Sequence, residues 1–251
     1  MIENTTIDDF LGGKVQIEQP VKGYRAGVDA VLLAASIDAS TGESVLELGA
    51  GVGTASLCLH ARVKGLRMTS VELQADYADI CKRNAARNQC GMVVETADFT
   101  SLPDHIRQLQ FDHVIMNPPY FERSKGASSD DLGRDIAMAG ATDLLDWIKI
   151  GSKRLAPKGY LTVIQRIERL PDVLIAAAER LGSVCVRPVT ARRGRPAKLF
   201  ILRARNAGQA PFRMLPPLVM HEGERHEADA EDYTQQVQGI LRDGDKLGWN
   251  A

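Results

Sequence analysis

The sequence predicts a doubly wound α/β fold built on a mostly parallel sheet. Short apolar runs typical of buried strands alternate with helical patterns through the middle of the chain. A glycine-rich turn, residues 49–53, joins the first of these strands to a helix, and acidic residues follow the next two strands. At 251 residues, 44% of them hydrophobic, the chain is long enough to bury a substantial core.

Seven strands are expected, five in a βα series and two in a closing hairpin. A hairpin at the end of such a series places its last strand antiparallel to the rest. The expected strands are residues 45–48, 68–71, 92–94, 111–116, 160–164, 184–189 and 199–202, with a further edge strand around Val15 and Ile17. The expected helices are residues 30–35, 55–59, 75–88, 144–155, 171–181 and 231–241.

Composition excludes several classes of protein. The net charge of -1 gives no global attraction to nucleic acid, so such binding would need a local basic patch. The four cysteines lie far apart and form no C-x-x-C pair, which favours reduced thiols in a cytoplasmic protein. No apolar run approaches the length of a membrane span, and the histidines show no metal-ligand spacing, so we expect neither membrane nor metal.

The turn Glu47-Leu48-Gly49-Ala50-Gly51-Val52-Gly53 is the first candidate binding element. Glycine permits positive φ and a close approach of backbone to a ligand. The spacing is G-x-G-x-G, without the third glycine of the dinucleotide fingerprint, which disfavours a nicotinamide enzyme. The carboxylate of Glu47 suits a ligand with positive charge better than a pyrophosphate. A tight strand-to-helix connection alone would also explain the glycines.

Two further acids follow later strands. Glu72 comes about twenty positions after the glycines, where Rossmann-like folds bind ribose hydroxyls. Asp98 follows the third strand and is, taken alone, an ordinary loop or cap residue. Because parallel strands end at one edge of the sheet, the acids should meet there beside the glycine turn.

The fourth strand runs directly into Asn117-Pro118-Pro119-Tyr120. An exocyclic amino group is a poor nucleophile, because its lone pair is delocalised into the ring. The Asn117 side-chain oxygen and the Pro118 carbonyl can hold both amino hydrogens, and the prolines stiffen the turn so that these acceptors are preorganised. Tyr120 can stack on a planar target, worth ~1–3 kcal/mol by analogy with base–aromatic stacking. A merely rigid turn would not explain why Asn and Tyr flank the prolines.

These motifs together resemble class I S-adenosylmethionine-dependent methyltransferases with an N-P-P-Y signature. Within that group, the segment Gly23-Tyr24-Arg25-Ala26-Gly27-Val28-Asp29 and the later Leu215-Pro216-Pro217-Leu218 are similar to the bacterial tRNA1(Val) adenine-37 N6-methyltransferase family. The resemblance implies a Rossmann-like sheet of seven strands and methyl transfer to N6 of an unpaired adenine in RNA, tRNA in particular. It implies S-adenosyl-L-methionine as cofactor, bound by Arg25, Asp29, Glu47, Gly49, Gly51, Gly53, Glu72, Asp98, Phe99 and Asn117, with Asn117, Pro118, Pro119 and Tyr120 catalytic.

Two loops are candidates for contact with the substrate. The tip of the closing hairpin carries Arg192, Arg193, Arg195 and Lys198, which form either a phosphate-contacting patch or a solvated turn. The polar stretch 122–134 has the composition of a loop overhanging the site. Residues 1–40 are expected to form an N-terminal extension packed on a catalytic domain of residues 41–251, and the protein to be a monomer or weak dimer.

Two other functions stay open on the sequence. A protein glutamine-N5 methyltransferase fits the same acceptors, because an amide also presents a planar NH2 group. That family usually carries an N-terminal helical domain, and only about forty residues precede the first strand of the sheet. A non-catalytic, cofactor-binding RNA-binding module is the other alternative, and intact Asn117 and Tyr120 argue against it.

Overall fold

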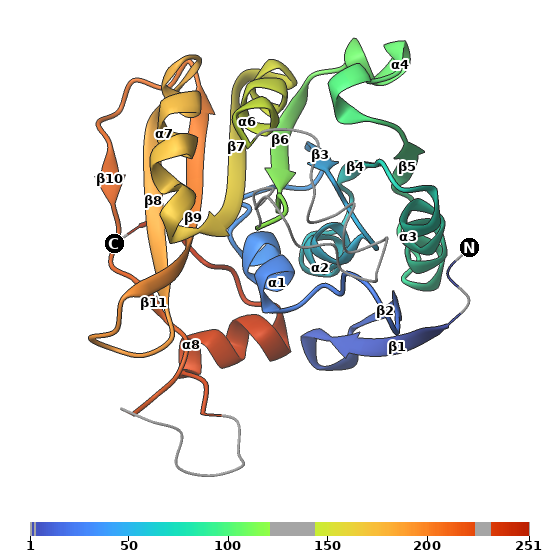
Figure 1. Cartoon of the computed structure of the whole chain (residues 1–251), viewed down its shortest axis with the longest axis horizontal. Helices are drawn as coiled ribbons and strands as arrows, with labels where there is room; N and C mark the ends of the chain where they lie inside the picture. The colour runs from blue at the N-terminus through green and yellow to red at the C-terminus, as the bar shows by residue number, and fades with distance from the viewer. Residues whose placement is uncertain (1, 3, 121–143, 224–231, 251) are drawn as a thin grey trace, which may run out of the picture.

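A central sheet with helices on both faces organises the chain in the computed structural model, which describes residues 2, 4–120, 144–223 and 232–250 (Figure 1). The sheet has nine strands in the order β10-β8-β9-β7-β6-β3-β4-β5, with β11 pairing beside β8. The strands are β3 (Ser44–Leu48), β4 (Arg67–Glu72), β5 (Val93–Thr96), β6 (Phe111–Met116), β7 (Leu155–Arg166), β8 (Leu181–Thr190), β9 (Ala197–Asn206), β10 (Arg213–Met214) and β11 (Leu218–Val219).

The strand order reverses at β3. From β3 the chain builds outward through β4 and β5 on one side, and through β6 and β7 on the other, all of them parallel. β9 then inserts between β7 and β8 and runs antiparallel to both. The predicted fold class and its antiparallel closing hairpin are therefore confirmed, with two short strands, β10 and β11, beyond the seven predicted. In such sheets a ligand binds at the carboxyl ends of the strands on either side of the reversal, here β3 and β6.

Alternating side chains of the inner strands feed two hydrophobic cores. In β3, Val45 packs with one core, while Leu46 and Leu48 pack with the other. The first core lies under α1, α2 and α3, and the second under α6 and α7. The helices are α1 (Val28–Ala35), α2 (Thr54–Arg62), α3 (Ala75–Arg87), α4 (Asp104–Arg107), α6 (Leu144–Lys153), α7 (Leu170–Ala178) and α8 (Gln235–Gln238), with the one-turn segments η1 (Leu11–Gly13), η2 (Phe99–Ser101), η3 (Ile167–Arg169) and η4 (Gly239–Asp243).

An N-terminal hairpin forms a separate two-stranded sheet of β1 (Thr5–Phe10) and β2 (Val15–Pro20). The predicted edge strand at Val15 and Ile17 is β2, but it pairs with β1 and not with the main sheet. The hairpin lies next to α3 (Figure 1). The division into an N-terminal extension of residues 1–40 and a catalytic domain of residues 41–251 stays a prediction.

Some predicted boundaries were wrong. The helix expected at 30–35 begins two residues earlier, at Val28, with Gly27 as its N-cap, so Asp29 lies in the first turn, where its carboxylate accepts from the Tyr120 hydroxyl. The last predicted helix begins only at Gln235, because Thr234 is its N-cap and accepts from the Val237 amide, and α8 is followed by a π-helical turn. The expected loop at 122–134 lies outside the described residues.

Candidate active site

The carboxyl ends of β3, β4 and β6 bring the predicted motifs together. The Gly49 and Ala50 amides donate to the Val71 carbonyl at 2.8 and 3.1 Å, which ties the start of the glycine turn to β4. The Gly51 amide donates to Glu72 Oε2 at 2.7 Å. The turn that follows β3 therefore wraps around the end of β4, as the sequence motif predicts.

The three glycines of the turn adopt positive φ, at 66° for Gly49, 55° for Gly51 and 86° for Gly53. A Cβ on Gly49 would lie 2.3 Å from the Trp147 ring of α6. A Cβ on Gly51 would meet the Tyr24 ring at 3.5 Å, an ordinary contact distance. Gly49 is thus required by packing as well as by backbone conformation, whereas Gly51 is required by conformation alone.

Two buried carboxylates flank the turn. Glu72 accepts from the Gly51 amide and, through Oε1, from the Gln74 amide at 2.9 Å, and burial raises its pKa. Glu47 is 3% exposed and accepts from the amide and hydroxyl of Ser56, one turn into α2. Burial raises the pKa of Glu47 to about 7, and the neighbouring Glu72 charge adds to the shift. A cation placed between them would relieve this repulsion.

Asp98 and Phe99 follow β5 at the same edge of the sheet. Asp98 Oδ1 accepts from the Thr100 amide and hydroxyl at 2.8 and 2.7 Å, which fixes the carboxylate at the start of η2. The rings of Phe99 and Trp147 lie 4.2 Å apart, tilted by 50°. Trp147 therefore packs against both Gly49 and Phe99, and it joins the glycine turn to the segment after β5.

The Asn-Pro-Pro-Tyr segment follows β6 directly. The Asn117 Oδ1 atom is buried and has no hydrogen-bond partner within the described part of the chain. An unpaired buried acceptor costs about 1–3 kcal/mol, and a donor bound at this oxygen would remove that cost. The Pro118 carbonyl accepts from Gln165 Nε2 at 3.1 Å and keeps a second lone pair. Gln165 is fully buried at the end of β7.

Tyr120 is held by α1. Its hydroxyl donates to Asp29 Oδ2, and burial followed by the Asp29 charge raises the Tyr120 pKa, which keeps the phenol protonated. Burial also raises the pKa of Asp29, and the Tyr120 hydrogen bond opposes that shift. Asp29 therefore fixes the orientation of the Tyr120 ring at the site.

Other predicted site residues lie elsewhere or have other partners. Arg25 bonds to Asp8, to Thr6 Oγ1 at 3.0 Å and to the Pro20 carbonyl at 2.7 Å, so its guanidinium holds the N-terminal hairpin. Arg192 bonds to Asp232 and to the Glu222 carbonyl. The remaining basic residues of the hairpin tip are exposed: Arg193, Arg195 and Lys198.

Three further residues at the site escaped the sequence prediction. Tyr24 lies over Gly51, and its amide donates to the Tyr77 hydroxyl at 2.8 Å. Trp147 and Gln165 come from α6 and β7, distant in sequence from the motifs they support. The position of Tyr24 next to Arg25 was the only sign in the sequence that Tyr24 could lie at the site. No sequence motif indicated Trp147 or Gln165.

Metal clusters and membrane spans are both absent from the described part of the chain. No group of three or more His, Cys, Asp or Glu side chains there is placed to hold a metal ion. No helix in those same ranges has the length and apolar character needed to cross a membrane.

The parallel sheet with an antiparallel closing strand, and the glycine turn followed by acids, are the architecture of class I methyltransferases. The sequence model of the methyltransferase small domain matches residues 25–174. The chain belongs to this family.

Individual relatives carry more specific names than the family does. A tRNA1(Val) (adenine(37)-N6)-methyltransferase of Shewanella baltica is 32% identical over 161 residues, which cover 61% of this chain and 66% of that protein, just under two thirds. The protein of the same name from Glaesserella parasuis is 26% identical over 84% of this chain and 88% of its own length. Among solved structures, a predicted O-methyltransferase from Agrobacterium tumefaciens has a TM-score of 0.70 at 25% identity and covers 89% of this chain and 100% of its own.

A more distant structural match is the 16S rRNA N2 G1207 methyltransferase of T. thermophilus, solved with AdoMet and guanosine. Its TM-score is 0.57 at 18% identity, covering 81% of this chain and 50% of that one. At this identity the match supports the fold alone.

Proposed function

We propose that this chain is an S-adenosylmethionine-dependent methyltransferase that methylates the exocyclic N6 of an unpaired adenine in tRNA. The observation that carries the proposal is the buried, unpaired Asn117 Oδ1 in a proline-stiffened turn beside the glycine loop. The names of the relatives above support adenine in tRNA as the substrate. The cytoplasmic location and the oligomeric state stay predictions.

The residues around the glycine turn suit this cofactor. Its sulfonium and ammonium groups are cationic, and burial together with the Glu72 charge raises the pKa of Glu47, so a cation bound nearby would favour the charged carboxylate. Glu72 would hold the ribose, Asp98 and Phe99 the adenine, and the positive-φ turn would allow close backbone approach. When bound, S-adenosylmethionine supplies an electrophilic methyl group.

The chain's own residues then prepare the nucleophile. Asn117 Oδ1 and the second lone pair of the Pro118 carbonyl accept the two amino hydrogens, which draws the nitrogen lone pair out of conjugation. Gln165 keeps the Pro118 carbonyl aimed, and Asp29 keeps the Tyr120 ring in place for stacking. Methyl transfer to the amino nitrogen would leave it cationic, and the methylated amino group would then lose one proton to solvent.

The tip of the β8–β9 hairpin would contact the tRNA backbone at the same edge of the sheet as the Asn-Pro-Pro-Tyr segment. Leu199 of β9 pairs with Arg166, the neighbour of Gln165, so the hairpin tip begins beside the Pro118 contact. Of the four basic residues in the tip, we propose that Arg193, Arg195 and Lys198 contact phosphates. Arg192 instead holds the segment around Asp232 in place.

Replacing Glu72 tests the cofactor site. Glu72→Ala should weaken S-adenosylmethionine binding by ~1–3 kcal/mol, as expected for losing hydrogen bonds to a charged group. Isothermal titration calorimetry on the folded variant measures this directly. Unchanged affinity would remove Glu72 from the site.

The hairpin tip has a built-in control. Replacing Arg193, Arg195 and Lys198 with Ala should weaken tRNA binding and reduce the slope of log K against log salt by ~1 for each phosphate that is no longer neutralised. Arg192→Ala should leave the slope unchanged, because that guanidinium already binds Asp232. Fluorescence anisotropy across a salt series would measure the tRNA affinity and the slope for each variant. Equal slopes for the triple variant and the wild type would identify the tip as a solvated turn.

The choice of substrate is tested by competition. Purified enzyme and methyl-labelled cofactor are incubated with unmodified tRNA and a peptide release factor together. Label recovered in the tRNA fraction supports the proposal. Label recovered only in the protein fraction would identify a glutamine-N5 methyltransferase instead, and no label in either, with cofactor binding intact, would favour a non-catalytic module.

A further inference from the structure

The peptide in the middle of the glycine turn is held by a residue of α3. The Val52 carbonyl accepts from Asn84 Nδ2 at 3.0 Å. Val52 lies between Gly51 and Gly53, which restrict their own backbone least of all residues. The direction of this carbonyl therefore depends on the external hydrogen bond.

Asn84 uses its whole hydrogen-bonding capacity. Its Nδ2 also donates to the Glu18 carbonyl at 2.9 Å, and its Oδ1 accepts from the Glu18 amide at 2.7 Å and from Arg87 at 3.1 Å. The side chain is fully buried, and a side-chain amide has two donors and two acceptor positions. One amide thus joins the glycine turn to β2 of the N-terminal hairpin.

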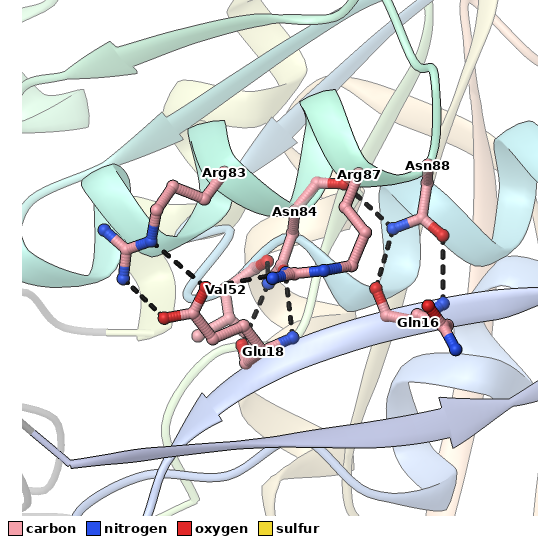
Figure 2. A network of polar contacts seen from close by, with 7 residues as sticks. All are labelled: Gln16, Glu18, Val52, Arg83, Asn84, Arg87 and Asn88. Atoms are coloured by element: carbon pink, nitrogen blue, oxygen red, sulfur yellow. Dashed lines mark hydrogen bonds and ion pairs between the residues drawn. The ribbon is translucent and has the colours of Figure 1, made fainter.

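Asn88, one turn further along α3, makes the same pair of contacts with β2 but none with the glycine turn. Its Nδ2 donates to the Gln16 carbonyl at 2.7 Å, and the Gln16 amide donates to its Oδ1 at 2.9 Å. Four residues of a helix and two residues of a strand each span ~6–7 Å. The two asparagines, four residues apart, therefore lie opposite β2 residues that are two apart. Figure 2 shows both side chains pointing from α3 to β2, with only Asn84 reaching Val52.

Arginines of α3 add an ionic contact to the same strand. Arg83 bonds to both carboxylate oxygens of Glu18 at 2.7 and 3.1 Å, and Arg87 lies 3.5 Å from Glu18 Oε2 (Figure 2). The Arg83 hydrogen bond is the main reason that the Glu18 pKa falls to about 2. Arg83 therefore docks the hairpin without touching the glycine turn.

We propose that Asn84 is a positioning residue for the cofactor and that the N-terminal hairpin is, through it, part of the cofactor site. The inference rests on the proposed function. Without Asn84 the Val52 carbonyl loses its partner, the glycine turn samples more conformations, and binding must then order it.

Three variants separate this role from general docking of the hairpin. Asn84→Ala should raise the Kd for S-adenosylmethionine about tenfold, the scale expected when a buried hydrogen bond is lost. Asn88→Ala and Arg83→Ala, which weaken the hairpin contact alone, should stay within about twofold of wild type. At saturating cofactor the kcat of Asn84→Ala should remain near wild type, so that the loss appears in KM for the cofactor.

Hydrogen exchange provides a readout that needs no cofactor. Amides of residues 51–54 should exchange faster in Asn84→Ala than in Asn88→Ala. Asn84→Asp, which keeps the acceptor for the Glu18 amide but loses the donor to Val52, replaces the alanine variant if that one does not fold. Unchanged Kd and exchange, or an equal loss in Asn88→Ala, would overturn the inference. A wild-type protein that binds no S-adenosylmethionine refutes the proposed function, while the exchange experiment still decides whether Asn84 orders the turn.

Discussion

Asn117→Ala should reduce kcat by about two to three orders of magnitude, the loss seen when a preorganised group that stabilises a transition state is removed. The Asn117 Oδ1 atom is buried and has no partner among the described residues, so the variant removes an acceptor that the folded protein keeps for a donor. Its contribution grows as the amino nitrogen turns pyramidal, so it should affect turnover far more than cofactor binding.

Single-turnover kinetics with tRNA, together with calorimetry for the cofactor, would measure both quantities. Asn117→Asp is the matched variant, because it keeps an acceptor oxygen at the same position and should retain more activity than the alanine variant. If Asn117→Ala keeps most of its kcat, or if it loses cofactor affinity in proportion, the role assigned to Asn117 is wrong.

Gly49→Ala should destabilise the fold by about 2–5 kcal/mol and abolish cofactor binding. A φ of 66° costs a non-glycine residue ~1–2 kcal/mol, and overpacking a filled site adds ~1–3 kcal/mol. The new Cβ would lie 2.3 Å from Trp147, which is buried and packed on Phe99, so the ring cannot move aside freely.

Gly42→Ala is a control that introduces the same backbone strain without a steric clash. Gly42 has a φ of 89°, but a Cβ there would meet nothing within 4 Å. Chemical denaturation of both variants should show a loss of about 1–2 kcal/mol for Gly42→Ala, the strain alone, and a clearly larger one for Gly49→Ala. Equal losses would mean that Trp147 does not constrain the glycine turn.

The sequence was sufficient to predict seven strands of the sheet because their apolar runs are recognisable, but it did not predict the two-residue strands β10 and β11. It did not predict β1 or the order of the strands. β1 is Thr5–Phe10, a half-exposed strand without a continuous apolar face, and it pairs only with β2. Strand order depends on contacts between distant segments, which periodicity does not encode.

At the site, Glu72 was predicted to lie beside the glycine turn, and it accepts from the Gly51 amide; the residues that support the turn and the Asn-Pro-Pro-Tyr segment were not predicted. Trp147 fills the space left by the hydrogen of Gly49, and Gln165 bonds to Pro118, each from a different part of the chain. Arg25 and Arg192 were predicted to bind ligands from their positions in the sequence. In the structure, Arg25 forms an ion pair with Asp8, and Arg192 forms one with Asp232. Such pairings are set by tertiary structure and cannot be seen in local sequence.

Nucleoside analysis of tRNA shows whether the methyl group is transferred to an adenine amino nitrogen. Unmodified tRNA is incubated with S-adenosylmethionine and either wild-type protein or Asn117→Ala, digested to nucleosides and measured by mass spectrometry. We expect N6-methyladenosine with the wild type and almost none with the variant. A methylated product on any other nucleoside or on the ribose, or equal N6-methyladenosine from both proteins, would contradict it.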